Sequence, residues 1–270
     1  SGEIANEFLN IRPEGAASGF VDKAAVQYGG KLSHVRPCRV IHFKMNAAAL
    51  KAVAGRKGAT VTAYILSLMF VAGRRATDVI DGDFNIQVPV NMRKFYSSET
   101  LRNFSMYCGI RIPLTEISEP DTLIPEIMRQ LTVKASRQAM NEMVNATNRM
   151  TKAIRFIPLF LKAPAARLIY GFLGDRIFSN TLSNLGVVSL PPELAGRIDS
   201  MDFVLGASIT NRASCAMVTF GDTATLSVTK NTADPSFEEA LYELLCRDGL
   251  TPVVEGSELL ADYYFISEDT

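Results

Sequence analysis

The sequence predicts an α/β (α+β) fold in which a mixed β-sheet is covered by helices. Segments that alternate apolar and polar residues, as half-buried strands do, recur along the chain. Between them lie stretches with helical periodicity and recognisable cap residues. The 270 residues are 47% apolar and 21% charged, which is the balance of a folded chain with a core of its own.

The first part of the chain predicts one strand followed by two helices. Residues 38–45 alternate apolar and polar side chains, which indicates a strand with one buried face. Asn46 can cap the helix that follows, and Gly58 is expected to end it. Thr60 can cap a second, more apolar helix that ends near residue 75.

The middle of the chain predicts two strands and a long helix. The strands are expected over Phe84–Met92 and Ser105–Pro113, and Pro89 indicates that the first lies at an edge or carries a bulge. Asp121 can cap a helix that runs to about Met150. The methionines of this helix predict a face that packs on the core or lines a groove: Met128, Met140, Met143 and Met150.

The last third of the chain predicts several short strands and one helix. The strands are expected over Thr181–Val188, Met201–Ile209, Cys215–Phe220, Ala224–Thr229 and Pro252–Glu255. Ser236 and Glu239 have the spacing of a capping box at the start of the helix, and Gly249 is expected to end it.

Residues 1–35 are expected to be a lead-in or linker and residues 257–270 an acidic, solvated tail, and the length of the chain fits one large domain or two small ones. The longest apolar stretch, residues 63–72, is shorter than the ~20 residues that a membrane span needs, so no membrane partner is expected. The N-terminus has neither the basic region nor the apolar run of a signal peptide. It begins with Ser1 instead of Met, so we expect a processed chain or a piece of a longer protein.

Charge and metal-binding residues argue against several functions. The 28 basic and 28 acidic side chains balance, which argues against nucleic acid as the main partner. His34 and His42 are the only histidines, which excludes a histidine-rich metal site and leaves two candidates for a histidine base. The cysteines form no CxxC pair, so we expect no metal site and four reduced core thiols in a cytoplasmic protein: Cys38, Cys108, Cys215 and Cys246.

The sequence lacks the motifs of several common enzyme classes. It contains no GxSxG elbow, P-loop, GxGxxG or HExxH. Four short clusters at predicted strand ends and turns remain, at residues 88–94, 100–104, 181–194 and 203–206. Asn, Arg and Ser at such positions can orient a substrate or hold a carbonyl oxygen, but they also serve as turn and cap residues. The residues alone leave both interpretations open.

Three long runs carry a family resemblance. PVNMRKFYSSETLRNF stands at Pro89–Phe104, RFIPLFLK at Arg155–Lys162 and LSNLGVVSLP at Leu182–Pro191. In this order they resemble the C-terminal half of bacterial alcohol acetyltransferase-like proteins. That group is part of the CoA-dependent acyltransferase superfamily, with chloramphenicol acetyltransferase and the condensation domains of nonribosomal peptide synthetases. The resemblance covers about residues 36–256.

The resemblance implies one half of a two-half, chloramphenicol acetyltransferase-like fold. It implies acyl transfer from acyl-CoA or another acyl thioester, as cosubstrate, to an alcohol or amine, without a permanently bound cofactor. In the family, a histidine in an HHxxxDG motif of the N-terminal half takes the acceptor's proton, and the substrate tunnel runs between the halves. The implied partner is such an N-terminal half, in the same longer chain or separate, or a second copy of this chain.

The HHxxxDG motif is absent from this sequence. His42 follows Ile41 instead of a second histidine, and Asn46 and Ala47 stand where the motif has Asp and Gly. By resemblance, His42 lies in the first strand of the C-terminal half and His34 in the lead-in. Neither histidine is expected to be catalytic.

The resemblance also implies roles for residues near the tunnel. Arg93 would pair with the motif Asp of the other half and so organise the histidine loop. Ser183 and Asn184 would hydrogen-bond the developing oxyanion or position the donor, and Gly186 would let the backbone approach closely. Two more residues are expected to be structural polar anchors: Asn91 and Asn103.

Three functions remain open at this point. The first is the C-terminal subdomain of an acyltransferase, inactive without its N-terminal half. The second is a non-catalytic binding or interaction module of the same fold, whose lead-in packs on the domain and covers the face that the other half would occupy. The third is an enzyme active alone through His42 or Cys108 in an unrecognised arrangement.

Overall fold

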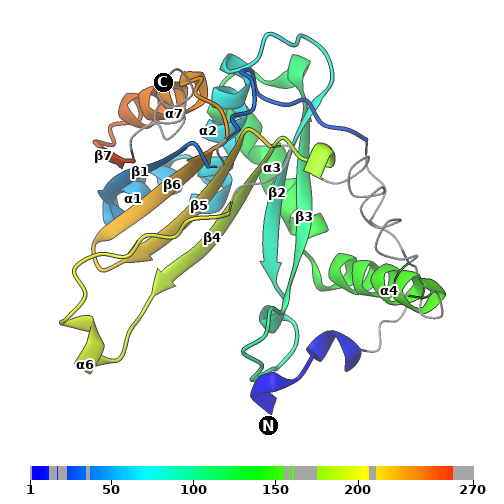
Figure 1. Cartoon of the computed structure of the whole chain (residues 1–270). Helices are drawn as coiled ribbons and strands as arrows, with labels where there is room; N and C mark the ends of the chain where they lie inside the picture. Colours follow the sequence, from blue (N-terminus) through cyan, green and yellow to red (C-terminus); the bar gives the residue numbers. More distant parts are fainter. Residues whose placement is uncertain are drawn as a thin grey trace, which may run out of the picture.

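A computed structural model of the chain has a seven-stranded mixed sheet with helices packed on one face (Figure 1). The structure describes residues 2–11, 17, 23–34, 37–154, 158, 160, 175–206 and 211–257. The strand order across the sheet is β3-β2-β4-β5-β6-β1-β7. The predicted fold class, a mixed α/β sheet covered by helices, is confirmed.

The strands follow the predicted segments with one exception. They are β1 (Arg39–Asn46), β2 (Asp83–Asn91), β3 (Ser105–Pro113), β4 (Asn180–Val188), β5 (Ala213–Phe220), β6 (Thr223–Lys230) and β7 (Val253–Gly256). Strand β4 is parallel to both β2 and β5, and the remaining neighbours are antiparallel. The strand predicted over Met201–Ile209 is wrong for Met201–Gly206, which joins no ladder, and its last residues lie outside the described part.

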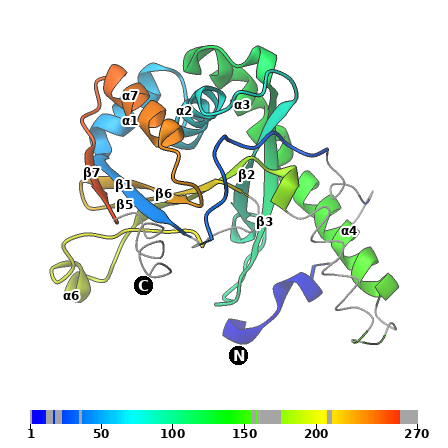
Figure 2. The ribbon, with the colours of Figure 1, turned by 45° about the horizontal axis from the view of Figure 1, so that its top comes forward.

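The helices lie in one layer over the sheet, apart from α4 and the short α6 (Figure 2). Their bounds are α1 (Ala47–Arg56), α2 (Val61–Arg75), α3 (Pro120–Lys134), α4 (Arg137–Ile154), α6 (Pro192–Ala195) and α7 (Ser236–Arg247). Short 3₁₀ turns occur at Gly2–Ile4, Glu7–Leu9, Met92–Lys94, Leu114–Glu116 and Asp175–Ile177. As predicted, Asn46 accepts a hydrogen bond from the Ala49 amide (2.9 Å) and Thr60 accepts one from the Ala63 amide (3.2 Å).

The core lies between the helical layer and the sheet. Helix α2 is its centre, because every residue from Ala63 to Gly73 is buried. Alternate residues of β1 reach it from below, with Ile41, Phe43 and Met45 at 4% exposure or less. Burial of eleven consecutive residues means that α2 is covered on all faces along this stretch. The burial of such apolar side chains is the main favourable contribution to folding.

The other face of the sheet is covered in part by an extended segment. Met201, Phe203 and Leu205 are half-buried while the residues between them are exposed, and Figure 2 shows this stretch running on the side away from the helices. The Thr229 hydroxyl donates to the Leu205 carbonyl (3.0 Å), and Lys44 approaches Asp202 (3.7 Å). The alternation that resembled a strand therefore reflects contact with the sheet face and not a place in the ladder.

The long helix predicted from Asp121 is in fact two helices. It begins at Pro120, with Asp121 in the first turn, and stops at Ala135. Ser136 then accepts a hydrogen bond from the Ala139 amide (3.2 Å), which starts α4 in a new direction, away from the sheet. The methionines divide accordingly: Met140 and Met143 are buried, Met128 packs against the core, and Met150 is 53% exposed.

The start of α7 also differs from the prediction. Pro235 occupies the N-cap position without a side-chain bond, and Oδ1 of the preceding Asp234 accepts hydrogen bonds from the amide (2.9 Å) and the hydroxyl (2.6 Å) of Ser236. The capping box with Glu239 is not formed. Gly249 ends the helix with φ +85, as predicted.

Part of the expected lead-in belongs to the domain. Tyr28 is 5% exposed and stacks on Phe237 of α7 with ring centroids 4.6 Å apart. Nearby amides extend this contact, since Val26 donates to the Asp83 carbonyl (2.9 Å) and Gly29 to the Ala76 carbonyl (2.6 Å). The run at 155–162 and the tail beyond residue 257 lie almost entirely outside the described residues. Three cysteines are buried, but Cys246 is exposed, which corrects the expectation of four core thiols.

Candidate functional site

Strands β2 and β4 pair at one end only. Their parallel ladder consists of Ile86 with Asn180 and Gln87 with Thr181, after which the strands diverge (Figure 1). We call the diverging ends, Val88–Asn91 of β2 and Leu182–Val188 of β4, the β2–β4 fork. Two of the three long sequence runs meet here, because one starts on β2 and the other runs along β4.

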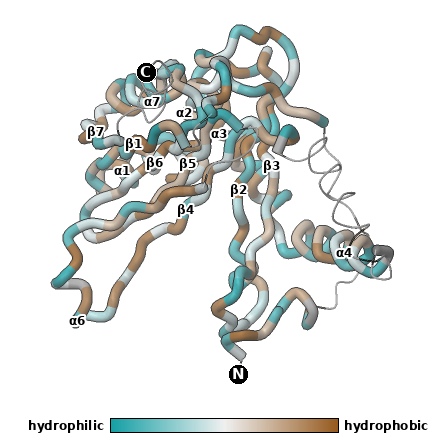
Figure 3. Tube along the Cα trace, viewed as in Figure 1, coloured by the Kyte–Doolittle hydropathy of each residue, from teal (hydrophilic) through white to brown (hydrophobic). Residues whose placement is uncertain are grey.

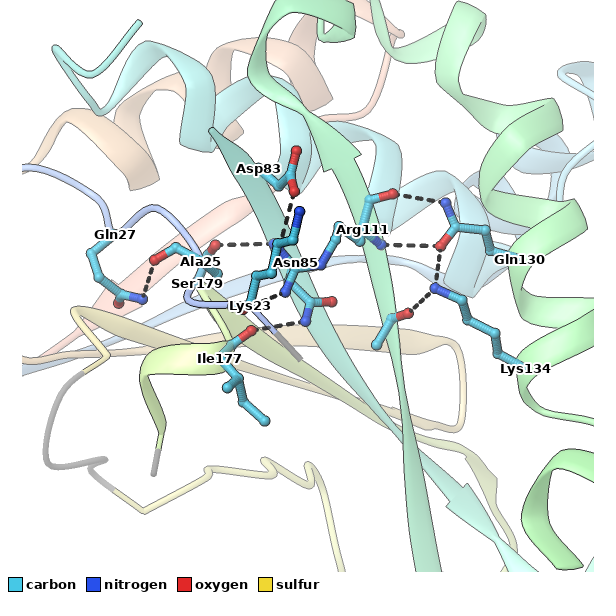
Figure 4. Close-up of polar contacts among 11 residues, drawn as sticks. Lys23, Ala25, Gln27, Asp83, Asn85, Arg111, Gln130, Lys134, Ile177 and Ser179 are labelled. Atoms are coloured by element: carbon cyan, nitrogen blue, oxygen red, sulfur yellow. Dashed lines mark hydrogen bonds and ion pairs between the residues drawn. The ribbon is translucent and has the colours of Figure 1, made fainter. Parts of the chain in front are cut away.

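Buried hydrogen bonds close the base of the fork. The Asn85 amide donates to the Ser179 hydroxyl (3.1 Å), and the Ser179 amide donates to the Asn85 carbonyl (2.8 Å). The Asn85 side chain also donates to the Ile177 carbonyl (2.8 Å), as Figure 4 shows. One step further along, the Thr181 hydroxyl donates to the Gln87 side-chain oxygen (3.1 Å). These contacts hold the start of β4 against β2.

The outer edge of β3 is closed by side chains of α3 (Figure 4). Gln130 accepts from the Arg111 amide (3.1 Å) and donates to the Arg111 carbonyl (2.8 Å), as a neighbouring strand would. Lys134 donates to the Gly109 carbonyl (2.8 Å). The Arg111 guanidinium reaches Asp83 (3.2 Å) and the Lys23 carbonyl (2.7 Å). No sequence motif predicts this network. It satisfies backbone hydrogen-bonding groups on the outer edge of β3 that could otherwise pair with another strand.

Pro89 keeps the β2 side of the fork unpaired. The backbone N–H and C=O of Asn85 both bond to Ser179, just before β4. Backbone groups alternate in direction along a strand, so those of Gln87 and Pro89 also point toward β4. Pro89 has no amide hydrogen to offer. The prediction that Pro89 lies at an edge is confirmed at this point, because β2 pairs there with β3 alone.

Ser183 and Asn184 point to opposite faces of the sheet. Leu182 is fully buried on the helical side, and side chains alternate along a strand, so Asn184 shares that side and Ser183 does not. The Asn184 amide donates to the Thr62 hydroxyl (3.1 Å) at the start of α2, and its oxygen accepts from the Gly186 amide (2.8 Å). The Ser183 hydroxyl has no hydrogen-bond partner among the residues that the structure describes. The two neighbours therefore offer different chemistry: Asn184 is engaged internally, and Ser183 presents a free hydroxyl.

Gly186 allows a local distortion of β4. Its φ is +76, and the register with β5 shifts between Asn184 and Val187. A Cβ at Gly186 would meet nothing within 4 Å. Within the described residues the glycine is thus needed for its backbone conformation and not for space.

Arg93 lies just beyond the β2 tip of the fork. Its Nη2 donates to the carbonyls of Thr100 (2.6 Å) and Arg102 (3.0 Å), which holds the β2–β3 loop. Its Nε and Nη1 have no partner in the described part of the chain. Asn91 accepts from the Arg93 amide (3.0 Å), and Asn103 accepts from the amide (3.2 Å) and hydroxyl (2.7 Å) of Ser105.

The two histidines and Cys108 lie outside the fork. His42 is on β1, half-buried, with Nδ1 2.9 Å from the Ser227 hydroxyl, and His34 is exposed. Burial raises the pKa of the Cys108 thiol to about 11, so little thiolate forms at neutral pH. Among residues 2–257, as far as they are described, no cluster of three His, Cys, Asp or Glu side chains could hold a metal ion. None of the described helices combines the length and apolar character needed to span a membrane.

Comparison with solved structures relates this sheet to known enzymes. Over 84% of its length the chain superposes on a trichothecene 15-O-acetyltransferase from Fusarium sporotrichioides, with a TM-score of 0.58, 11% identity and 49% of that chain covered. The epimerization domain from the third module of tyrocidine synthetase B gives a TM-score of 0.52 at 9% identity, with 84% of this chain and 51% of that chain covered. The chain has an acyltransferase and condensation-domain fold.

The same fold is found in polyketide synthase associated protein 5 from Mycobacterium tuberculosis. That match has a TM-score of 0.51 at 12% identity and covers 84% of this chain and 54% of the other. No protein-family model matches the sequence, and no curated protein sequence matches it significantly. The chain spans about half the length of the solved acyltransferase and condensation-domain folds that it resembles.

Proposed function

We propose that this chain is the C-terminal half of an acyltransferase that moves an acyl group from an acyl thioester to an alcohol or amine. The observation that carries the proposal is the β2–β4 fork, which has a free Ser183 hydroxyl on one arm and a partly unpaired Arg93 beyond the other. No histidine lies in the fork, since His34 and His42 are the only ones in the chain. The base would come from an N-terminal half.

Arg93 is suited to hold a carboxylate of that other half. Two backbone carbonyls fix its Nη2, which leaves Nε and Nη1 as single donors on two different edges of the guanidinium. A guanidinium held in this way can donate a charge-assisted hydrogen bond to a carboxylate and loses little side-chain entropy on binding. Arg93 would therefore position the histidine loop without taking part in the reaction.

Ser183 is suited to donate a hydrogen bond to the developing oxyanion or to the donor. Its hydroxyl has no competing partner in the described residues, so donation breaks no existing hydrogen bond. Asn184 would act through position alone, because its link to Thr62 ties β4 to the start of α2. The cosubstrate would be acyl-CoA or another acyl thioester, no cofactor would stay bound, and a cytoplasmic location stays a prediction.

Exposed apolar residues beside the fork support an interface with the other half. Leu185 and Val187 on β4 are 55% and 74% exposed, and Leu194 and Ile198 beyond it are 50% and 37% exposed. Figure 3 shows apolar residues along this arm around α6. A row of exposed apolar side chains of this kind marks a contact surface in many proteins.

Comparing the isolated chain with the chain joined to an N-terminal half tests the proposal. The readout is free thiol released from acetyl-CoA in the presence of an alcohol. We expect residues 1–270 alone to release no thiol above background, and the complete reading frame with an HHxxxDG half to be active. Full activity of residues 1–270 alone, or a complete reading frame without such a half, would overturn the proposal.

Ser183→Ala is expected to lower kcat of the joined protein by about 100- to 1,000-fold, because one donor to the developing charge is lost. His42→Ala is the control and is expected to leave kcat unchanged, since His42 lies on β1 and bonds to Ser227. Both values come from thiol-release kinetics at saturating acetyl-CoA. A loss of activity in His42→Ala with none in Ser183→Ala would revive a histidine mechanism within this chain.

A non-catalytic interaction module is the second candidate, and one observation favours it. The N-terminal segment packs on the β2–β3 loop, with the Thr100 hydroxyl donating to the Ala5 carbonyl (2.6 Å) and the Leu101 amide to the Glu3 carbonyl (2.8 Å). A lead-in that covers this loop competes with another half for Arg93. Absence of thiol release by the protein encoded in the complete reading frame would favour this candidate.

A further inference from the structure

A cavity of about 670 Å³, open to solvent, lies beside the β2–β3 loop. Three parts of the chain that are distant in sequence line it: the N-terminal segment around Glu7, the β2–β3 loop from Phe95 to Phe104, and the start of α4 at Arg137 and Asn141. The volume is in the range of small-molecule sites. None of its lining residues belongs to the β2–β4 fork, so it is separate from the proposed transfer site.

One part of the cavity wall is aromatic. Phe104 is 1% exposed and therefore rigidly held, with Phe8 packed edge-on against it at a centroid distance of 5.1 Å. Tyr96 lies 6.2 Å from Phe104, and both rings line the cavity. Phe104 therefore supports this wall from behind, and the accessible rings are those of Tyr96 and Phe95, which favour a planar apolar group.

The α4 side of the cavity supplies a cation and hydrogen-bond donors. The Arg137 guanidinium lies over the Tyr96 ring, 5.3 Å from its centroid, and has no hydrogen-bond or ion-pair partner among the described residues. Asn141 accepts a hydrogen bond from the Tyr96 hydroxyl, which leaves its amide hydrogens available. The contact with the ring orients the guanidinium, so less side-chain entropy is lost when it binds an anion.

The N-terminal wall carries the one acidic residue of the lining. Glu7 accepts a hydrogen bond from the Asn10 side chain (3.0 Å) and lines the cavity on the N-terminal segment. Its charge disfavours an anion on that wall. The negative group of a ligand is therefore expected at α4, with an uncharged part of the ligand near Glu7.

We propose that this cavity binds a small organic anion that carries a planar ring. The carboxylate or phosphate would pair with the Arg137 guanidinium and the Asn141 amide, and the ring would pack on the half-buried rings of Tyr96 and Phe95. Charge-assisted hydrogen bonds of this type, in a site walled by aromatic rings, give both affinity and orientation. The bound ligand would also tether the N-terminal segment to the domain, because that segment forms one wall.

Titration of the chain with three ring compounds tests this site by NMR. Phenyl phosphate and phenylacetate carry the two anionic groups, and benzyl alcohol is the neutral probe. We expect at least one anion to bind more tightly than benzyl alcohol and to shift the signals of Tyr96 and Asn141. The anion with the higher affinity identifies whether the site prefers phosphate or carboxylate.

Arg137→Gln is expected to weaken the preferred anion at least tenfold and to leave benzyl alcohol unchanged. Arg149→Gln is the matched control, because Arg149 is exposed on the same helix and does not line the cavity. Arg137→Lys keeps the charge without the flat guanidinium and should give an intermediate affinity. Absence of binding by both anions, or equal affinities in Arg137→Gln and Arg149→Gln, would overturn the proposal.

Discussion

Lys230→Met is expected to lower the free energy of unfolding by about 3–5 kcal/mol, since it leaves a buried carboxylate without its partner. Lys230 ends β6 and donates to both oxygens of Glu238 on α7 at 2.6 Å, with side chains 3% and 9% exposed. The Asp234 carbonyl accepts a further bond from the same ammonium group. Urea unfolding followed by circular dichroism gives the change.

The pH dependence of this variant has a defined sign. Burial raises the pKa of Glu238 above its ordinary value even beside Lys230, and loss of the ammonium raises that pKa further. A carboxyl whose folded pKa lies above its unfolded pKa costs stability as the pH rises past the unfolded value. The deficit of Lys230→Met relative to the parent chain should therefore be larger at pH 8 than at pH 5.

Two controls separate this effect from loss of a surface ion pair. Arg75→Met breaks an exposed pair with Glu243 (3.4 Å) and should change stability by less than about 1 kcal/mol. Lys230→Met with Glu238→Leu removes both charges and should recover part of the loss. A double variant as unstable as the single one would show that the charge of Glu238 is not the cause.

Gly109→Ala is the second substitution with a large expected effect, a loss of about 2–4 kcal/mol. A Cβ at Gly109 would lie 2.6 Å from Oδ1 and 3.2 Å from Cγ of Asn85, which is fully buried. Asn85 cannot give way without breaking its bond to the Ile177 carbonyl at the base of the fork. The same unfolding measurement applies, together with the amide signal of Ser179, which should shift.

Gly55→Ala is the matched substitution in open space. A Cβ at Gly55 meets nothing within 4 Å, and the residue lies inside α1. Alanine is the better helix former, so this variant should be equal to the parent chain or more stable by up to about 1 kcal/mol. If Gly109→Ala proved equally harmless, the contact with Asn85 would not be tight.

Local rules predicted most of the elements. The period-two pattern of β1 and the caps at Asn46 and Thr60 depend on residues only a few positions apart, and each is confirmed. The break at Ser136 is not predicted, because the apolar residues keep a helical period on both sides of it. The strand predicted over residues 201–206 is wrong, because a segment that lies on a sheet face alternates half-buried and exposed side chains just as a strand does.

The candidate site was less predictable. Sequence resemblance pointed to Ser183 and Asn184 as one unit, although alternation along a strand already separates them onto two faces. The short ladder between β2 and β4 joins residues more than ninety positions apart, and no local rule states where such a pairing stops. The contacts of Asn85 depend on the same distant pairing, and those of Gln130 depend on how α3 packs against the edge of β3, so neither set follows from a local rule.

Among the described strands, only two residue pairs join β2 and β3 to the rest of the sheet, so these two parts of the sheet can rotate relative to each other about this junction at the base of the fork. From Thr181 to the end of β4 the arm is about 23 Å long at ~3.3 Å per residue. A rotation of about 5° at the junction moves the tip by about 2 Å, which is enough to break or make a hydrogen bond. The distance between Arg93 and the far end of β4 therefore depends on residues at the base of the fork that contact neither of them. A small displacement of Asn85 by an added Cβ at Gly109 would produce a larger change in that distance.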